Sequence, residues 1–261
     1  MGPTHALSGA ALWLGGLAIA RNGGVEISTE VALVSTAVCA GSAMLNDIDE
    51  PESTIARTFG PVSQLISVGV NKTSAGIYNL TQGPRDQQVT DGHRGITHTV
   101  LGALITGSLV SALTGIFGKP AILITFFITF GLAIRGLLAD TVRQYGWIGI
   151  TGITIAATAG AYALLPQEAN LWWLGLPVAI GMILHDLGDM ITKEGAPLLA
   201  PLVPIRGKRW WEFALPSLLR IRAGGAAEYG LYGTLFTVIL IVSAAAVFAD
   251  ANVFAMMKED L

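Results

Sequence analysis

The sequence predicts an all-α, polytopic membrane protein with about seven transmembrane helices. Hydrophobic residues make up 52% of the 261 residues, charged residues make up only 13%, and the mean hydropathy is +0.61. Soluble domains carry roughly a quarter of charged residues, and here the deficit extends over the whole chain. The composition therefore excludes a soluble domain held by a single anchor.

Seven apolar runs approach the length of about 20 residues that a helix needs to cross a bilayer core. They cover residues 5–20, 31–46, 97–117, 120–139, 147–165, 171–189 and 229–249. The first run has no Lys or Arg before it, so we interpret it as a retained helix rather than a signal peptide. The last is the clearest, because it is uncharged and has Tyr229 and Tyr232 at one end. We expect one membrane-embedded domain over 1–228, then a C-terminal span and short tail over 229–261.

Alternating spans place two long polar segments, 47–96 and 190–228, on the same side as the N-terminus. That side receives all of the 15 Lys and Arg residues except Arg21, Lys119 and Lys258. Cytoplasmic loops carry the Lys and Arg excess. The N-terminal side is therefore predicted to face the cytoplasm, with the protein in the inner membrane.

All four histidines lie at predicted span boundaries on this same side. They are His5, His93, His98 and His185. Two carboxylates, Asp47 and Asp49, follow the second span on that side as well. Because the topology rests on apolar runs and basic residues alone, this gathering is an independent indication of a metal site.

The local spacings suit metal ligands. His185 and Asp189 are four residues apart and share one face of a helix, whereas Asp186 points elsewhere. His93 and His98 are five apart, so we expect His93 in a loop, His98 in the first helical turn and a bend permitted by Gly95.

The other two carboxylates belong to a short turn. Asp47 and Asp49 are two residues apart, which favours an extended or turn geometry that ends at Pro51. They complete a donor set of imidazoles and carboxylates without thiolate, since the single cysteine, Cys39, lies in an apolar run. This set suits Zn²⁺, with Mn²⁺ and Fe²⁺ as alternatives. Nothing in the sequence indicates nucleic-acid binding.

Two interpretations of Arg94 stay open. It lies between Asp91, His93 and His98, where its guanidinium could bind a substrate phosphate or could pair with Asp91.

Four sequence blocks occur in order over residues 4–202: THALSG, LNDIDEPES, GHRGITHTVLG and HDLGDMITKEGAPLLAPL. These blocks resemble those of the YdjM-like (LexA-regulated) membrane-bound metal-dependent hydrolases. The third and fourth blocks are specific, whereas the first is weak alone. Asn46 stands where the family usually has Pro. Glu50 stands where it frequently has His, which makes Glu50 a further candidate ligand or base.

The resemblance implies seven metal ligands. They are His5, Asp47, Asp49, His93, His98, His185 and Asp189. Asp186 falls where the family usually has an apolar or small residue and is left out. The order of the motifs is also similar to that of the helical zinc-dependent phospholipase C fold, which is an analogy of fold alone.

The expected activity is metal-dependent hydrolysis in the domain 1–228. Seven ligands exceed the three or four that one zinc ion takes from protein, so two or more ions are expected, and such clusters favour phosphoester cleavage. Asp47 or Asp49 would bridge the ions or act as general base, and Arg94 would steady the phosphate. A site at the cytoplasmic face suggests a lipid or amphiphilic phosphoester. The alternatives are a metal transporter or sensor without hydrolytic activity, and a metal that only staples helices.

Overall fold

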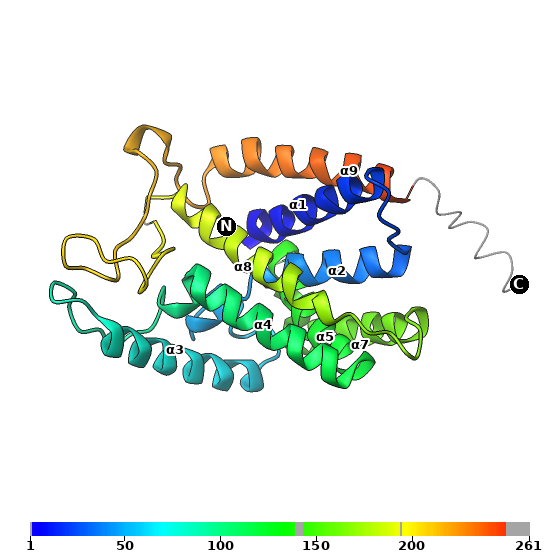
Figure 1. Cartoon of the computed structure of the whole chain (residues 1–261), viewed down its shortest axis with the longest axis horizontal. Coiled ribbons are helices and arrows are strands. Elements are labelled where there is room, and N and C mark those ends of the chain that lie inside the picture. The colour runs from blue at the N-terminus through cyan, green and yellow to red at the C-terminus, as the bar shows by residue number, and fades with distance from the viewer. Residues whose placement is uncertain (1, 139–142, 194, 249–261) are drawn as a thin grey trace, which may run out of the picture.

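The computed structural model describes residues 2–138, 143–193 and 195–248, and within them the chain is built from helices. Eight α-helices occur in this described part (Figure 1). They are α1 (Gly2–Asn22), α2 (Thr29–Ser42), α3 (Pro61–Thr81), α4 (Val100–Phe117), α5 (Lys119–Leu137), α7 (Gly146–Leu164), α8 (Gly175–Met190) and α9 (Thr234–Phe248). The predicted all-α class is confirmed.

Four helical segments are long and apolar enough to cross a membrane: α4, α5, α7 and the continuous helix Glu228–Phe248, which includes α9. The other three predicted spans are helical too, as α1, α2 and α8. However, α2 and α8 have only 14 and 16 residues. The exact number of seven spans stays a prediction.

Helix α3 was not predicted from the sequence. It occupies 21 residues of the polar segment 47–96, where only short apolar runs were recognised. Its buried residues are small and, except for Ala75, polar, including Ser67 and Ser74, whereas Leu65 and Leu80 are 74% and 88% exposed. The helix therefore turns serines inward and leucines outward, the reverse of a soluble amphipathic helix.

Helix α2 lies at the centre of the bundle and packs against α1, α5 and α8. Small residues allow these close approaches. A Cβ atom on Gly9 of α1 would lie 2.8 Å from the Cys39 carbonyl oxygen, and one on Gly181 of α8 would lie 2.5 Å from the same atom. Helices that meet through small residues are typical of packing in lipid. Cys39 itself is buried.

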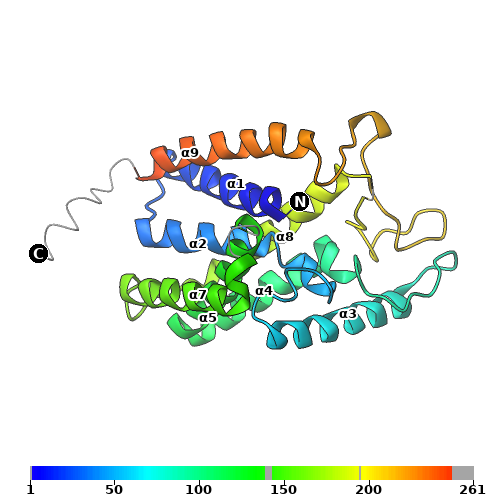
Figure 2. The same ribbon diagram turned by 180° about the vertical axis from the view of Figure 1, so that it is seen from behind.

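The loops at one end of the bundle form a polar cap, which we define as residues 82–99 and 191–225 (Figures 1 and 2). Asp86 Oδ2 accepts the backbone N–H groups of Gly83 and Arg209 at 2.7 and 2.9 Å. The ring of Trp210 stacks on that of Tyr78, with 4.6 Å between their centroids. The cap contains loops from both long polar segments, 47–96 and 190–228, and the α1–α2 connection lies at the opposite end of the bundle. This arrangement agrees with the predicted alternation of the spans.

Candidate metal centre

The structure brings all four histidines together, although they come from three separate parts of the chain. The ring of His5 stacks on that of His185 with 4.1 Å between centroids. His98 meets His185 edge-on at 5.2 Å, and His93 meets His98 edge-on at 5.6 Å. The N-terminal turn of α1, the start of α4 and the last turns of α8 therefore converge on one point.

His185 presents one nitrogen to the interior of the cluster. Its Nδ1 lies 2.8 Å from the carbonyl oxygen of Ala43. Because a carbonyl only accepts, Nδ1 carries the proton and Nε2 carries a lone pair. Nε2 lies 3.5 Å from Asp47 Oδ1 and 3.8 Å from Asp189 Oδ2. The i,i+4 placement of His185 and Asp189 on one face of α8 agrees with the sequence prediction.

His98 is arranged in the same way. Its Nδ1 lies 3.3 Å from Asp49 Oδ2, while its Nε2 lies 3.9 Å from both Asp47 Oδ1 and Asp189 Oδ2. His98 belongs to a short 3-10 turn, Ile96–His98, directly before α4, rather than to the first turn of that helix. Thr99 then caps α4 by accepting the N–H of Gly102.

The ligand atoms form two groups that could each hold an ion. In one, His5, His185 and Asp189 offer ligand atoms that all lie within 4.8 Å of one another, and in the other Asp47, His98 and His185 do so. The Nε2 atoms of His98 and His185 are buried and have no hydrogen-bond partner among the described residues. An unsatisfied buried nitrogen costs about 1–3 kcal/mol, and a divalent cation would remove that cost. The residues present therefore fit a metal ion.

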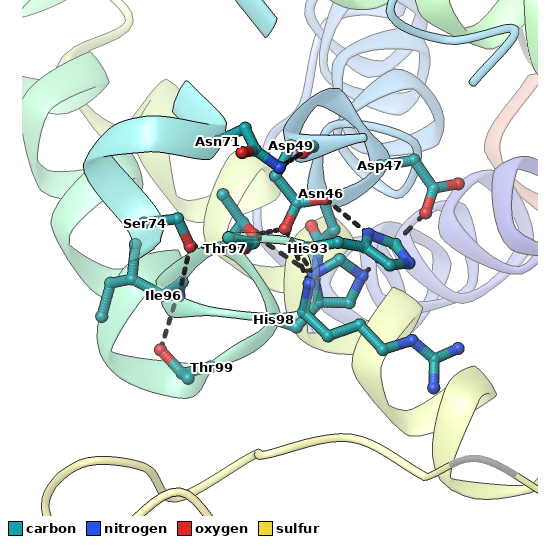
Figure 3. A network of polar contacts seen from close by, with 12 residues as sticks. Asn46, Asp47, Asp49, Asn71, Ser74, His93, Ile96, Thr97, His98 and Thr99 are labelled. Carbon is teal, nitrogen blue, oxygen red and sulfur yellow. Dashed lines mark hydrogen bonds and ion pairs between the residues drawn. The ribbon is translucent and has the colours of Figure 1, made fainter. Parts of the chain in front are cut away.

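Asp49 lies outside both groups and receives hydrogen bonds instead (Figure 3). It accepts from His93 Nδ1 and from the Arg94 N–H, each at 3.0 Å, and from the Thr97 hydroxyl. Burial alone would raise the pKa of Asp49, but hydrogen bonds from His93, His98 and Thr97 outweigh it and hold that pKa well below its usual range.

His93 lies at the edge of the cluster, and its side chain is 33% exposed. Its hydrogen bond to Asp49 raises its pKa, against the opposing effect of burial. His93 lies in a loop and the chain bends at Gly95, both as predicted. The residue with positive φ is Arg94, at 57°. Gly95 is needed for another reason, because a Cβ atom there would collide with the Ser74 hydroxyl.

Arg94 extends over the cluster from its polar side. Its Nη2 lies 3.1 Å from Asp189 Oδ2, and its Nη1 donates to the Gly195 carbonyl at 2.9 Å. The sequence had suggested Asp91 as a partner, whereas Asp91 accepts from the His93 backbone and from Asn71. Arg94 thus bridges the cluster and the polar cap.

Several residues that support the cluster were missed in the sequence. Asn46 Nδ2 donates to Asp186 Oδ1 at 2.6 Å, which ties the 3-10 turn Asn46–Asp49 to α8. Asn71 of α3 donates to the Asp49 carbonyl at 2.8 Å. Thr97 could have been noticed, because it stands between the two histidines of its motif. The role of Asn71 depends on a helix that was not predicted.

Three polar side chains at the cluster are partly exposed. The side chains of Asp47 and Arg94 are 31% and 21% exposed, whereas those of His5, His98 and Asp189 are at most 6% exposed. The partly exposed side chains of Asp47, His93 and Arg94 lie on the side of the cap, and we call this polar face of the cluster the polar mouth.

Comparison with known proteins yields one family. The family model described as "YdjM inner membrane protein" matches residues 1–148, which is more than half of the 261 residues. The matched part contains the first three sequence blocks, and the fourth, which begins at His185, lies beyond it. No curated protein and no solved structure matches the chain. The similarity to the phospholipase C fold therefore stays a prediction.

Proposed function

The chain belongs to the YdjM inner membrane protein family, and from this premise we propose that its His/Asp cluster is the active site of a metal-dependent hydrolase. The observation that carries the proposal is the pair of buried Nε2 atoms of His98 and His185, which have no hydrogen-bond partner among the described residues. They converge with Asp47 and Asp189 beneath a polar mouth. Such a donor set matches catalytic zinc sites better than a hydrogen-bonded structural core.

The proposed ligands differ in part from those that the resemblance implies. A single imidazole nitrogen binds one ion, so the two groups that share His185 cannot both use it. We assign one ion to His98, His185 and Asp189, which leaves a coordination position open and leaves Asp47 beside it to act on water. The other oxygen of Asp189 lies 3.5 Å from His5 Nε2, so these two residues would hold a second ion. Asp49 is then a positioning residue, because its contacts keep a proton on Nδ1 of His98 and leave Nε2 free.

The chemistry follows from these placements. A bound divalent metal supplies Lewis acidity that activates water near neutral pH and polarises a phosphoryl group. Asp47 is partly exposed at the polar mouth and acts as general base toward water. The Arg94 guanidinium, also in the mouth, orients the phosphate by charge-assisted hydrogen bonds. Asp49 and the Ala43 carbonyl hold the two imidazoles in the required tautomer.

The proposed substrate is a lipid or another amphiphilic phosphoester. The ligand residues lie in the first turns of α1, directly before α4 and in the last turns of α8, and a site at such helix ends suits a phosphate at the level of lipid headgroups. The excess of Lys and Arg on this side supports a cytoplasmic orientation of the site.

The test is an assay of phosphate release from dioleoyl phosphatidic acid by the full-length protein in nanodiscs, with and without a chelator. Activity should require the metal, and Asp47→Asn should reduce kcat by about 10²- to 10⁴-fold because the general base is lost. The matched control is Glu52→Gln, an exposed carboxylate in the same loop. Activity that ignores both the chelator and Asp47→Asn contradicts the proposal, and rapid zinc flux into vesicles would favour a transporter.

A further inference from the structure

An apolar groove adjoins the metal centre at His5. It encloses roughly 160 Å³ between α1, α8 and the beginning of the last helix. Its apolar walls include Leu12, Leu184, Leu187, Tyr232 and Phe236. Leu12 and Leu187 are each 40% exposed, so the groove is open along its flank.

His5 is the one proposed ligand among the described residues that line this groove. His5 lines the groove, stacks on His185 and contacts Asp189. It lies flat against α8 at Gly188, where a Cβ atom would come within 2.6 Å of His5 Cε1. A group that fills the groove therefore reaches the edge of the metal centre.

The groove is open because of how the last helix packs. Helix α9 runs along α1, and α8 lies on the other side of α1 (Figures 1 and 2). The first turns of the last helix, Glu228–Gly233, form a π-helix, a feature frequent at functional sites. The groove thus faces outward between two helices of a membrane-embedded bundle, where hydrocarbon chains are the surrounding solvent.

One end of the groove disfavours a phosphate. Glu228 is fully buried there, and its carboxyl oxygens accept from the Thr4 hydroxyl at 2.6 Å and from the Gly224 N–H at 2.7 Å. A hydrogen-bond acceptor at this point opposes an anionic headgroup. The polar mouth at Arg94 is the complementary place for it, so an amphiphile has only one favourable orientation.

We propose that this groove binds one alkyl chain of the substrate, with the phosphoester held at the metal centre and the headgroup in the polar mouth. The proposal rests on the proposed function and names the substrate class more closely. The volume is below the range of about 300–1,000 Å³ that is usual for whole ligands. The groove therefore takes the part of one chain nearest the phosphate, and the rest of the chain extends into the bilayer.

The test is photo-crosslinking of dodecylphosphonate that carries a diazirine near the phosphonate end. The probe is added to the zinc-loaded, full-length protein in phosphatidylcholine nanodiscs, and labelled peptides are identified by mass spectrometry. Labelling should map to α1, α8 and residues 228–236. It should be displaced by unlabelled dodecylphosphonate but not by dodecanol, and it should fall after chelation.

Leu187→Trp should reduce the labelling about tenfold by filling the groove. Leu235→Trp, on α9 outside the groove, should leave it unchanged.

The outcomes separate this inference from the proposed function. Labelling that dodecanol displaces equally, or that maps to the second apolar groove between α3 and α4 lined by Ile48, Phe59 and Ile66, overturns the chain site. If phosphatidic acid is nevertheless hydrolysed in a metal-dependent way, the hydrolase proposal stands. Specific labelling of the α8–α9 groove without hydrolysis supports the chain site and contradicts the hydrolase.

Discussion

At the scale of single residues, Asp49 supports the cluster from outside the set of proposed ligands. It is fully buried and accepts hydrogen bonds from one histidine, a threonine and a backbone N–H, and its Oδ2 lies 3.3 Å from His98 Nδ1. A carboxylate that orients metal-binding imidazoles raises their basicity and fixes their tautomer. Its contribution should therefore appear in the affinity for metal rather than in the amount of metal bound.

We predict that Asp49→Asn lowers metal affinity about 10- to 100-fold while stoichiometry is retained. The side-chain amide of the variant keeps one oxygen that accepts a hydrogen bond. Its NH₂ group, however, faces other hydrogen-bond donors and accepts none of their bonds. Competition with a fluorescent zinc chelator measures the affinity, and Glu52→Gln serves as the control. Loss of a whole equivalent of metal would show that Asp49 is itself a ligand.

Gly188 provides a second residue-scale prediction. Gly188→Ala places a methyl group 2.6 Å from His5 Cε1, so the ring has to move away from Asp189. We expect roughly a tenfold loss of metal affinity, as overpacking costs about 1–3 kcal/mol. Gly152→Ala on α7 is the matched control, because a Cβ atom there meets nothing within 4 Å. Equal metal affinities in Gly188→Ala and Gly152→Ala would show that Gly188 does not position the His5 ring.

At the scale of elements, the sequence predicted the apolar helices well and the connecting segments poorly. Apolar runs indicate helices α4, α5 and α7 because lipid-facing helices are apolar all round. Helix α3 escaped because its serines face the protein and its leucines face outward, so no continuous apolar run forms. The spacing of His185 and Asp189 follows from helical periodicity. The direction in which Asp49 points depends on the 3-10 turn Asn46–Asp49 and on α3, which local spacing does not reveal.

The polar cap should respond to acid through Asp86. Burial would raise the pKa of Asp86, but backbone hydrogen bonds from Gly83, Arg209 and Trp210 outweigh it and lower that pKa. A depressed pKa means that the ionised form stabilises the fold. This contribution is fully present above about pH 4, the value for an unfolded aspartate, and is lost as the pH falls through the lowered pKa.

Hydrogen-exchange protection factors for the Arg209 and Trp210 amides measure this effect. In the wild type they should fall on acidification below about pH 4. In Asp86→Asn they should already be low at neutral pH and change little. Glu212→Gln, an exposed carboxylate in the same segment, should behave like the wild type. Protection that declines equally with acid in Asp86→Asn would assign the effect to another group.

At the scale of the whole molecule, the gathering of histidines could be predicted from the sequence. The division between ligands and supporting residues, and the groove beside His5, could not. Alternating spans placed His5, His93, His98 and His185 on one side, and the structure brings them within contact distance. No sequence pattern distinguishes the metal ligands from the residues that position them, because both are histidines and carboxylates at the same predicted membrane boundary. The groove beside His5 depends on how α9 packs along α1, which is a property of the assembled bundle.

The central claim is that the buried cluster holds a divalent metal. Elemental analysis of the purified protein tests it most directly, with His98→Ala, His185→Ala and Glu52→Gln compared after circular dichroism has verified their helical content. The account predicts stoichiometric zinc, or another divalent metal, in the wild type and in Glu52→Gln, and its loss in both histidine variants. A metal-free wild type that has been offered zinc, or metal content unchanged in both histidine variants, would contradict it.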